Sequence, residues 1–278
     1  MIKSVITAAG RGVRLLPATK EMPKEMMPIF CKNNGQRILV PMLQFIFEKL
    51  YAANIRDYCF VVGREKRSIE DHFTPDYGYV RELSGKNREL ISAFYEKLEN
   101  SHLIWVNQNK PMGFGDSVRR TEKYVGHDDF VVHAGDVSIV GGSNYPIKRL
   151  IETAKKDPSI SCVLLCKKVT DPSRYGVPSV SKISKSLFLV NSVEEKPEKP
   201  KSNFGILPLY YFKPRIFDCL KKIKRGRGNE FQLTDAIQKL IDYGEKVVSI
   251  TLNSNEFEID VGTVESYRIA QKITYKIG

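Results

Sequence analysis

The chain alternates between short apolar runs and longer amphipathic stretches. After a strand-like N-terminal run, residues 40–55 repeat apolar side chains at helical spacing. Residues 57–63, DYCFVVG, then read as a buried strand bounded by Gly63. The same criteria predict further strands over 103–108, 129–136, 159–169, 186–197, 204–212 and 246–253, and helices over 77–101, 115–125, 145–156, 230–244 and after Gly262. This order is typical of βαβ units.

The pattern predicts one α/β domain over residues 1–278, with a Rossmann-like, mostly parallel mixed sheet flanked by helices. No long linker, low-complexity tract or repeat divides it. Ligands of open α/β sheets bind outside the carboxyl ends of the strands. Here we expect those ends at Gly10, Gln108, Asp136 and Asp260.

Composition limits the partners. The 44 Lys and Arg residues exceed the 32 Asp and Glu residues, giving a net charge of +12, which raises nucleic acid as a partner. The one dense basic run, 221–228, has no interleaved aromatic residues, so we expect no nucleic-acid binding. Apolar stretches of membrane-spanning length and a signal-peptide layout are both missing, and the five cysteines are scattered. We therefore expect a reduced, cytoplasmic protein that does not enter a membrane.

The stretch from Ile6 to Phe30 reads ITAAGRGVRLLPATKEMPKEMMPIF and follows the first strand. Its three prolines exclude a regular helix. The spacing of its glycines does not fit a dinucleotide-binding turn, and the chain has no Gly-Lys-Ser/Thr phosphate loop. What remains is a glycine turn carrying Arg14, Lys20 and Lys24, which suits a polyanion such as a triphosphate. An exposed basic loop without a ligand is the alternative.

The loop resembles the signature of sugar nucleotidyltransferases, and more closely that of bacterial-type UTP–glucose-1-phosphate uridylyltransferases. Later blocks resemble the same family in the same order across nearly the whole chain. These are QNKPMGFGDSV from Gln108, AGDV from Ala134, RYGV from Arg174, VEEKP from Val193, NEFQLTDAI from Asn229 and EIDVGTVESY from Glu258. One such block would be weak, whereas the ordered set is specific.

The resemblance implies transfer of a uridylyl group from UTP to glucose 1-phosphate, with release of pyrophosphate. It assigns Arg14 to the leaving pyrophosphate and Lys24 to the α-phosphate, roles that suit a guanidinium fork and a compact ammonium. It also implies that Asp136 and Asp260 hold Mg²⁺, whereas either aspartate alone is more often a turn or N-cap residue. His133, on the same strand, is interpreted as a core residue.

For the nucleoside, the resemblance implies contacts from Ala8, Ala9, Gly10, Gln108 and Gly113. The Gln108 amide offers a donor and an acceptor to the imide edge of a pyrimidine, and glycines at 113 and 115 would let the backbone approach the base. Uracil and thymine share that edge. Gln108 therefore cannot distinguish UTP from dTTP, and the assignment as a uridylyltransferase rests on the PKEMMP motif, because thymidylyltransferases usually carry glutamine where Glu25 stands.

On the sugar side, the resemblance implies that Glu195 binds sugar hydroxyls, Lys196 meets the sugar phosphate and Gly176 leaves room for the ring. Without it, residues 194–201 would be interpreted as a solvated, proline-stiffened loop. We accordingly expect a nucleotide-binding half over 1–142, and a sugar-phosphate-binding half with the C-terminal helix over 143–278.

Two positions depart from the family pattern. Val13 stands where threonine is usual, which removes a hydroxyl able to contact phosphate, and Asn229 replaces a common aspartate. Three alternatives therefore stay open: a thymidylyltransferase, a uridylyltransferase for another sugar 1-phosphate, and a non-catalytic nucleotide-sugar sensor. The resemblance also implies a homo-oligomer, for which the exposed 79–101 segment and the C-terminal helix are candidate contact surfaces.

Overall fold

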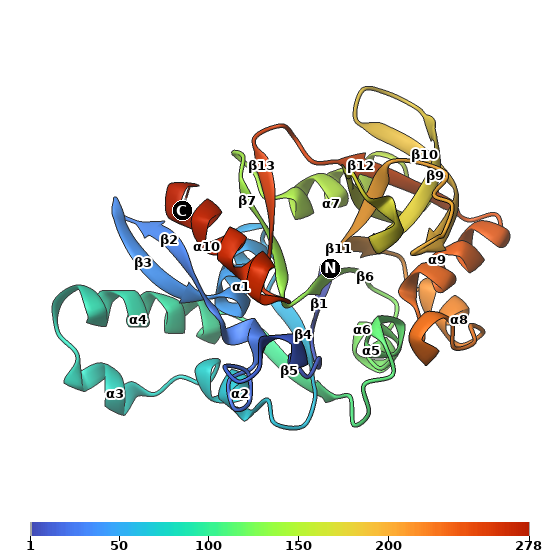
Figure 1. The fold of residues 1–278 in the computed structure, drawn as a ribbon. Helices are drawn as coiled ribbons and strands as arrows, with labels where there is room; N and C mark the ends of the chain where they lie inside the picture. Colours follow the sequence, from blue (N-terminus) through green and yellow to red (C-terminus); the bar gives the residue numbers. More distant parts are fainter. Residues whose placement is uncertain (1, 278) are drawn as a thin grey trace.

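A computed structural model describes residues 2–277. Its centre is a nine-stranded sheet with the order β5-β4-β1-β6-β11-β8-β12-β10-β9 (Figure 1). The strands are β1 (Ile2–Ala8), β4 (Asp57–Val62), β5 (His102–Asn107), β6 (Asp129–Ala134), β8 (Ile160–Lys168), β9 (Gly176–Lys182), β10 (Leu187–Glu195), β11 (Phe204–Phe212) and β12 (Lys246–Thr251).

The pairing confirms a mostly parallel mixed sheet. Strands β5, β4, β1 and β6 are all parallel, as are β8 and β12. Only β11 and β10 run against the other strands, because each is antiparallel to both of its neighbours. The sheet is continuous through both halves of the chain, so the carboxyl ends of the parallel strands lie along one edge region.

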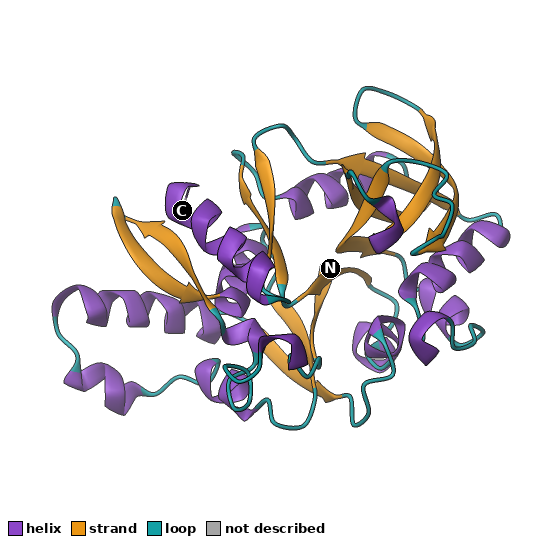
Figure 2. Cartoon of the chain, in the orientation of Figure 1, coloured by secondary structure: helices purple, strands orange, loops and turns teal. Residues whose placement is uncertain are grey.

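Helices cover both faces of this sheet (Figure 2). Successive residues of β4 alternate between two apolar clusters: Tyr58 and Phe60 belong to one, and Cys59 and Val61 to the other. The first cluster includes side chains of α1 (Met42–Ala52), α4 (Gly85–Glu99) and α7 (Pro146–Lys156). The second includes those of α5 (Phe114–Arg119), α6 (Glu122–Val125), α8 (Ile216–Leu220) and α9 (Leu233–Asp242).

Two small antiparallel ribbons lie outside the main sheet: β2 (Pro28–Asn33) with β3 (Gln36–Pro41), and β7 (Val137–Gly141) with β13 (Glu256–Asp260). The closing helix α10 (Val264–Ile277) lies beside the β2–β3 ribbon (Figure 1), and the Tyr267 hydroxyl donates to the Pro28 carbonyl at 3.0 Å. Within residues 2–277, none of the helices has the length and apolar character needed to cross a membrane.

Two predicted helices are wrong in extent. The 77–101 segment is divided into α3 (Tyr77–Glu82) and α4, because Leu83 and Ser84 are extended between them. Serine followed by glycine disfavours a helix interior. The 115–125 segment is likewise divided into α5 and α6 at Thr121, whose hydroxyl donates to the Val118 carbonyl at 2.8 Å. A short helix, α2 (Arg67–His72), was not predicted.

Candidate active site

The Gly/Pro-rich loop leaves the carboxyl end of β1 and folds into two short 3₁₀ turns, η1 (Val13–Leu15) and η2 (Lys24–Met26). Gly12 has φ +68°, a left-handed conformation that favours glycine. Its carbonyl accepts a hydrogen bond from the Thr19 hydroxyl at 2.7 Å. This bond holds the loop curved, and Arg14 remains exposed on it. The loop is therefore ordered by a hydrogen bond within itself, while its arginine stays accessible to a ligand.

Lys24 reaches back from η2 to the end of β6. Its ammonium forms an ion pair with the carboxylate of Asp136, and a side chain at Gly10 would place its Cβ 3.4 Å from the Lys24 Nζ. Lys20, by contrast, is exposed, and its ammonium lies 3.7 Å from the carboxylate of its neighbour Glu21. Of the two loop lysines, only Lys24 is directed into the site.

Asp260 also lies beside Asp136, but it belongs to a sheet other than the main one. We expected it at the end of a main-sheet strand, and this was wrong: it ends β13, in the ribbon where it pairs with Val137 of β7. Because β7 follows Asp136 directly, that pairing brings the two aspartates together, and the Val261 N–H donates to the Asp136 carbonyl at 2.9 Å. A Cβ at Gly262 would lie 2.8 Å from an Asp260 carboxylate oxygen and 3.8 Å from one of Asp136.

The charges of this cluster are coupled. Burial and the neighbouring Asp136 raise the pKa of Asp260, although the N–H of Gly262 and the ammonium of Lys24 oppose the shift. Burial disfavours the charged form of Lys24, but Asp136, Glu25 and Asp260 outweigh it and raise its pKa. Two carboxylates held together around one cation form an arrangement that further positive charge would stabilise.

This donor set fits a magnesium ion. Hard carboxylate oxygens are ligands that Mg²⁺ prefers, and it usually takes the rest from phosphates and water. The described residues contain no group of three or more histidine, cysteine or carboxylate side chains suited to a metal. Asp136 and Asp260 would therefore hold such an ion only together with a phosphate ligand.

Glu25, the motif residue on which the uridylyltransferase assignment rests, is enclosed by the protein. Its side chain is 1% exposed and forms a 2.8 Å ion pair with Lys66, which is itself 6% exposed. Burial raises the pKa of Glu25, and Lys66 offsets part of that rise. A carboxylate enclosed in this way has no surface for a pyrimidine base. Glu25 therefore gives no direct physical basis for distinguishing UTP from dTTP.

His133 is a core residue, as predicted, with no exposed surface. One ring nitrogen lies 2.7 Å from the Ala134 carbonyl, and the other lies 2.6 Å from the Tyr145 hydroxyl. Burial lowers the pKa of His133 to about 4, so the ring is neutral at physiological pH. It supports the turn that leads to Asp136.

Gln108 follows β5, next to the N-terminus of α5. Its side chain is 4% exposed and is hydrogen-bonded within the chain. The structure gives another reason for glycine at positions 113 and 115. A Cβ at these positions would lie 2.7 and 2.8 Å, respectively, from the Phe231 carbonyl oxygen. They leave room for the chain before α9, and a direct role of Gly113 in nucleotide binding stays a prediction.

The sugar-side residues lie together. Gly176 of β9 pairs directly with Glu195 of β10, and a Cβ at Gly176 would lie 3.3 Å from the Glu195 carboxylate and 3.1 Å from the Thr234 hydroxyl. Thr234 donates to Glu195 at 2.7 Å. Lys196 adopts φ +45°, which is unusual for a residue with a side chain. Its carbonyl accepts a hydrogen bond from Arg227.

A cleft of about 820 Å³ connects the two sides of the site. Arg14 from the first half lines it together with Lys196 and Asp260 from the second. It is also lined by three cations that sequence reasoning missed, Lys167, Arg174 and Arg227. Arg227 belongs to the basic run that was considered only for nucleic acid. The adjoining QLTD block was the available signal that this run borders the sugar side.

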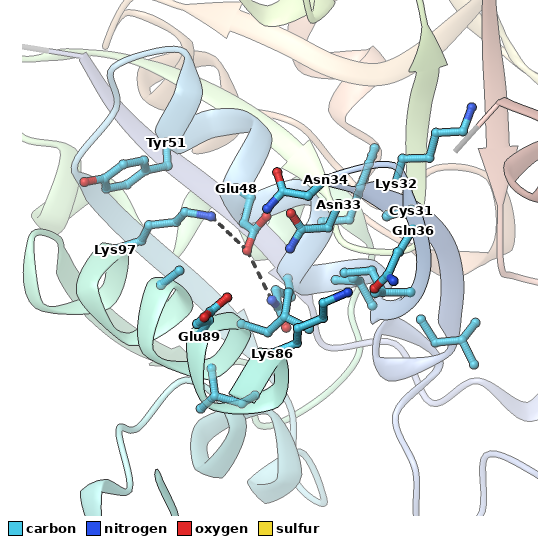
Figure 3. Close-up of a pocket in the computed structure, with 18 of the residues that line it drawn as sticks. Cys31, Lys32, Asn33, Asn34, Gln36, Glu48, Tyr51, Lys86, Glu89 and Lys97 are labelled. Atoms are coloured by element: carbon cyan, nitrogen blue, oxygen red, sulfur yellow. Dashed lines mark hydrogen bonds and ion pairs between the residues drawn. The ribbon is translucent and has the colours of Figure 1, made fainter. Parts of the chain in front are cut away.

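A separate groove of about 690 Å³ lies between the β2–β3 ribbon, α1 and α4 (Figure 3). Glu48 and Lys97 face each other across it at 3.2 Å. None of the residues predicted to take part in catalysis or substrate binding lines this groove. The cleft containing Arg14 and Lys196 is therefore the candidate active site.

Comparisons with known proteins agree with this geometry. The family model described as nucleotidyl transferase matches residues 3–276. The chain belongs to the nucleotidyl transferase family. It is 35% identical to a UTP–glucose-1-phosphate uridylyltransferase from Streptococcus pyogenes over 92% of this chain and 84% of that one. It is 39% identical to UTP–glucose-1-phosphate uridylyltransferase 1 of Staphylococcus saprophyticus, over 86% of this chain and 81% of that one.

The fold also matches solved structures. A UDP-glucose pyrophosphorylase complexed with UDP-glucose superposes with a TM-score of 0.86 at 27% identity, covering 99% of both chains. The family and the fold are thus established over nearly the full length of the chain. The candidate site lies at the carboxyl ends of β1 and β6, where ligands of open α/β sheets bind.

Proposed function

We propose that the protein transfers the uridylyl group of UTP to glucose 1-phosphate, giving UDP-glucose and pyrophosphate. One observation carries the proposal: Lys24, Asp136 and Asp260 form a compact charged cluster, and Asp260 lines a cleft together with Arg14 and Lys196. The names of the uridylyltransferase relatives and of the UDP-glucose complex support the choice of substrates.

A phosphate oxygen of glucose 1-phosphate attacks the α-phosphorus of UTP. A new P–O bond forms there, the bond from the α-phosphorus to the bridging oxygen breaks, and pyrophosphate leaves. Such transfers need positioning and charge stabilisation more than covalent help from the protein. Lys24 stabilises the α-phosphate, Arg14 holds the leaving pyrophosphate, and Lys196 holds the attacking sugar phosphate.

Asp136 and Asp260 would hold Mg²⁺ when the nucleotide is bound. The ion supplies charge neutralisation and orientation of phosphate oxygens. Without a bound nucleotide, the Lys24 ammonium forms an ion pair with the Asp136 carboxylate. This ion pair holds the Lys24 ammonium beside the proposed metal ligands, where we expect the α-phosphate of UTP to bind.

Glu195 orients the sugar through its hydroxyls and is itself fixed by Thr234. Ala8, Ala9, Gly10 and Gln108 form the nucleoside side at the carboxyl ends of β1 and β5. We further infer a homo-oligomer from the family resemblance, and a cytoplasmic location from the scattered cysteines and the composition of the chain. Light scattering during size-exclusion chromatography tests the self-association.

The testing experiment measures pyrophosphate release with Mg²⁺, crossing UTP, dTTP, ATP, GTP and CTP with glucose 1-phosphate and galactose 1-phosphate. We expect rapid release with UTP and glucose 1-phosphate. Release with dTTP at a similar rate would indicate dual specificity, because the two bases differ only by a methyl group. No release with any pair, from protein that still binds UTP, would contradict the proposal and support a sensor.

A further inference from the structure

The Gln108 side chain is held from three directions. Its Nε2 group donates to the Asp116 carboxylate at 2.9 Å and to the Gly113 carbonyl at 3.2 Å, while its Oε1 accepts from the Ser117 hydroxyl at 2.9 Å. Asp116 has no exposed surface. These partners come from the first turn of α5 and from the residue that precedes it. The amide is therefore anchored to the helix before any nucleotide binds.

Asp116 is maintained as a carboxylate. Arg119 contacts one of its oxygens at 2.7 Å, and the Nε of Arg120 contacts the other at 2.9 Å. Burial opposes the charge, but hydrogen bonds from Gln108, Arg120 and Arg119 keep the pKa of this carboxyl below its usual range. An ionised carboxylate only accepts hydrogen bonds. The Gln108 amide must therefore turn its NH₂ group toward Asp116.

This orientation limits what Gln108 can offer a ligand. Both N–H bonds of the amide are already engaged, by Asp116 and Gly113. Within residues 2–277, Ser117 is the one hydrogen-bond donor to Oε1, which leaves an acceptor lone pair on that oxygen. The expectation that Gln108 would present both a donor and an acceptor is therefore revised. In this arrangement it presents an acceptor alone.

We propose that Asp116 is a positioning residue that fixes Gln108 as an acceptor for the N3–H of the pyrimidine and so excludes cytosine. Uracil and thymine carry a hydrogen on N3, whereas cytosine has a lone pair there, which would face the Oε1 lone pair. The inference rests on the proposed nucleotide site at Gln108. It assigns the rejection of CTP to a buried carboxylate that touches no nucleotide, and it leaves UTP and dTTP undistinguished.

The test compares UTP with CTP in the wild-type protein, in Asp116→Asn and in Arg119→Gln. A carboxamide in place of the Asp116 carboxylate can present either an oxygen or an NH₂ group, so the Gln108 amide is free to reverse and offer a donor to N3 of cytosine. We expect the UTP-to-CTP ratio of kcat/KM to fall by about tenfold or more in Asp116→Asn. Arg119→Gln removes one ion pair and keeps the carboxylate, so its ratio should stay within about twofold of wild type.

The same ratio is measured by equilibrium binding of UTP and CTP without sugar phosphate. A wild-type protein that binds UTP but releases no pyrophosphate would contradict the proposed reaction, and the binding ratios would still test the role of Asp116. An unchanged ratio in folded Asp116→Asn would overturn the inference. Thermal unfolding establishes whether each variant is folded.

A nucleotide analogue tests the proposed contact between Gln108 and N3–H in the wild-type protein, without any substitution. N3-methyl-UTP lacks the N3–H, so the wild-type protein should bind it at least as weakly as CTP, whereas dTTP, which keeps that hydrogen, should bind well. Binding of N3-methyl-UTP as tight as that of UTP would show that Oε1 does not accept from N3, and the inference would be abandoned.

Discussion

The ammonium of Lys24 is ion-paired with the carboxylate of Asp136, although 112 positions separate them in the sequence. The pair joins the loop after β1 to the turn after β6, two strands that are neighbours in the sheet. A second tie reinforces the contact, because the Gly135 N–H donates to the Thr7 carbonyl at 2.8 Å. Lys24 and Asp136 are therefore brought together by one pair of adjacent parallel strands.

Replacing Lys24 should reduce catalysis while UTP binding is partly retained. Lys24→Met removes the charge aimed at the reacting phosphate, and we expect kcat to fall by about 10²–10³-fold, as when one charge-stabilising donor is lost. Lys20→Met is the matched control, since Lys20 is an exposed lysine of the same loop. Pyrophosphate release under saturating substrates measures both. Equal losses in the two variants would mean that the loop acts only through its net charge.

The Asp260 carboxylate should lower the thermal stability of the metal-free protein and be required for activity. Its carboxylate is half-buried beside that of Asp136, so Asp260→Asn relieves like-charge repulsion while the new amide oxygen can still accept from the Gly262 N–H. We expect a thermal midpoint without Mg²⁺ that is equal to or above wild type, and a loss of Mg²⁺-dependent turnover of about 100-fold or more.

Magnesium supplies the complementary measurement. With a non-reactive UTP analogue present, adding Mg²⁺ should raise the unfolding temperature of the wild-type protein, because ligands that bind only the folded state stabilise it. The rise should be much smaller in Asp260→Asn and in Asp136→Asn, and EDTA should reverse it. An undiminished rise in both variants would remove these aspartates from the metal site.

The Glu25–Lys66 pair should act on stability. Lys66→Met leaves the buried Glu25 carboxylate without a partner, which typically costs about 3–5 kcal/mol in the free energy of unfolding. The Glu25→Gln, Lys66→Met double variant removes both charges and should recover most of that loss. Urea denaturation of the singles and the double measures their coupling. We expect the UTP-to-dTTP ratio of folded Glu25→Gln to match wild type, because residue 25 is enclosed away from the cleft.

The sequence predicted eight of the nine strands of the main sheet, missing β9, because strand periodicity is a local pattern. The motif blocks supplied the candidate residues that the structure brings together, Lys24 with Asp136 and Gly176 with Glu195. It did not predict Lys66, whose significance lies in a contact with a residue 41 positions away. Asp260 was assigned to the main sheet because sequence alone does not say which strand a short apolar run will pair with. Gly113 and Gly115 were interpreted as making room for a ligand, whereas the space is taken by the Phe231 backbone. Contacts between residues distant in sequence depend on how the elements pack, which local sequence patterns do not specify.

Two histidines, the fully buried His133 and the half-buried His72, predict sensitivity to acid. Burial lowers the pKa values of His72 and His133 to about 4, below the ordinary value of 6.5. As pH falls below 6.5 the unfolded chain takes up these protons and the folded chain does not, so their contribution to stability is present above 6.5 and is lost down to about pH 4. Two protons correspond to a slope of at most about 2.7 kcal/mol per pH unit.

Urea unfolding at a series of pH values between 7 and 5 measures that slope. His72→Phe should reduce it by about half, because one of the two groups no longer titrates. The exposed His127 supplies the matched control, and His127→Gln should leave the slope within experimental error of wild type. A slope that is the same in all three proteins would indicate that other groups cause the acid sensitivity.

Val13 offers a gain of function. It is 62% exposed on the phosphate loop, next to Arg14, so a side chain here can reach a bound phosphate. Threonine has nearly the same shape and is also branched at Cβ, so Val13→Thr should fit the backbone and add one hydroxyl. A hydrogen bond to a charged group is worth about 1.5–3 kcal/mol, which corresponds to an increase in kcat/KM for UTP of about tenfold or more.

Leu39→Thr, at a similarly exposed apolar position on β3, is the control and should leave kcat/KM unchanged. If Val13→Thr leaves both kcat and KM at wild-type values, the hydroxyl has no phosphate within reach, and the loop would hold the triphosphate through its backbone and Arg14 alone.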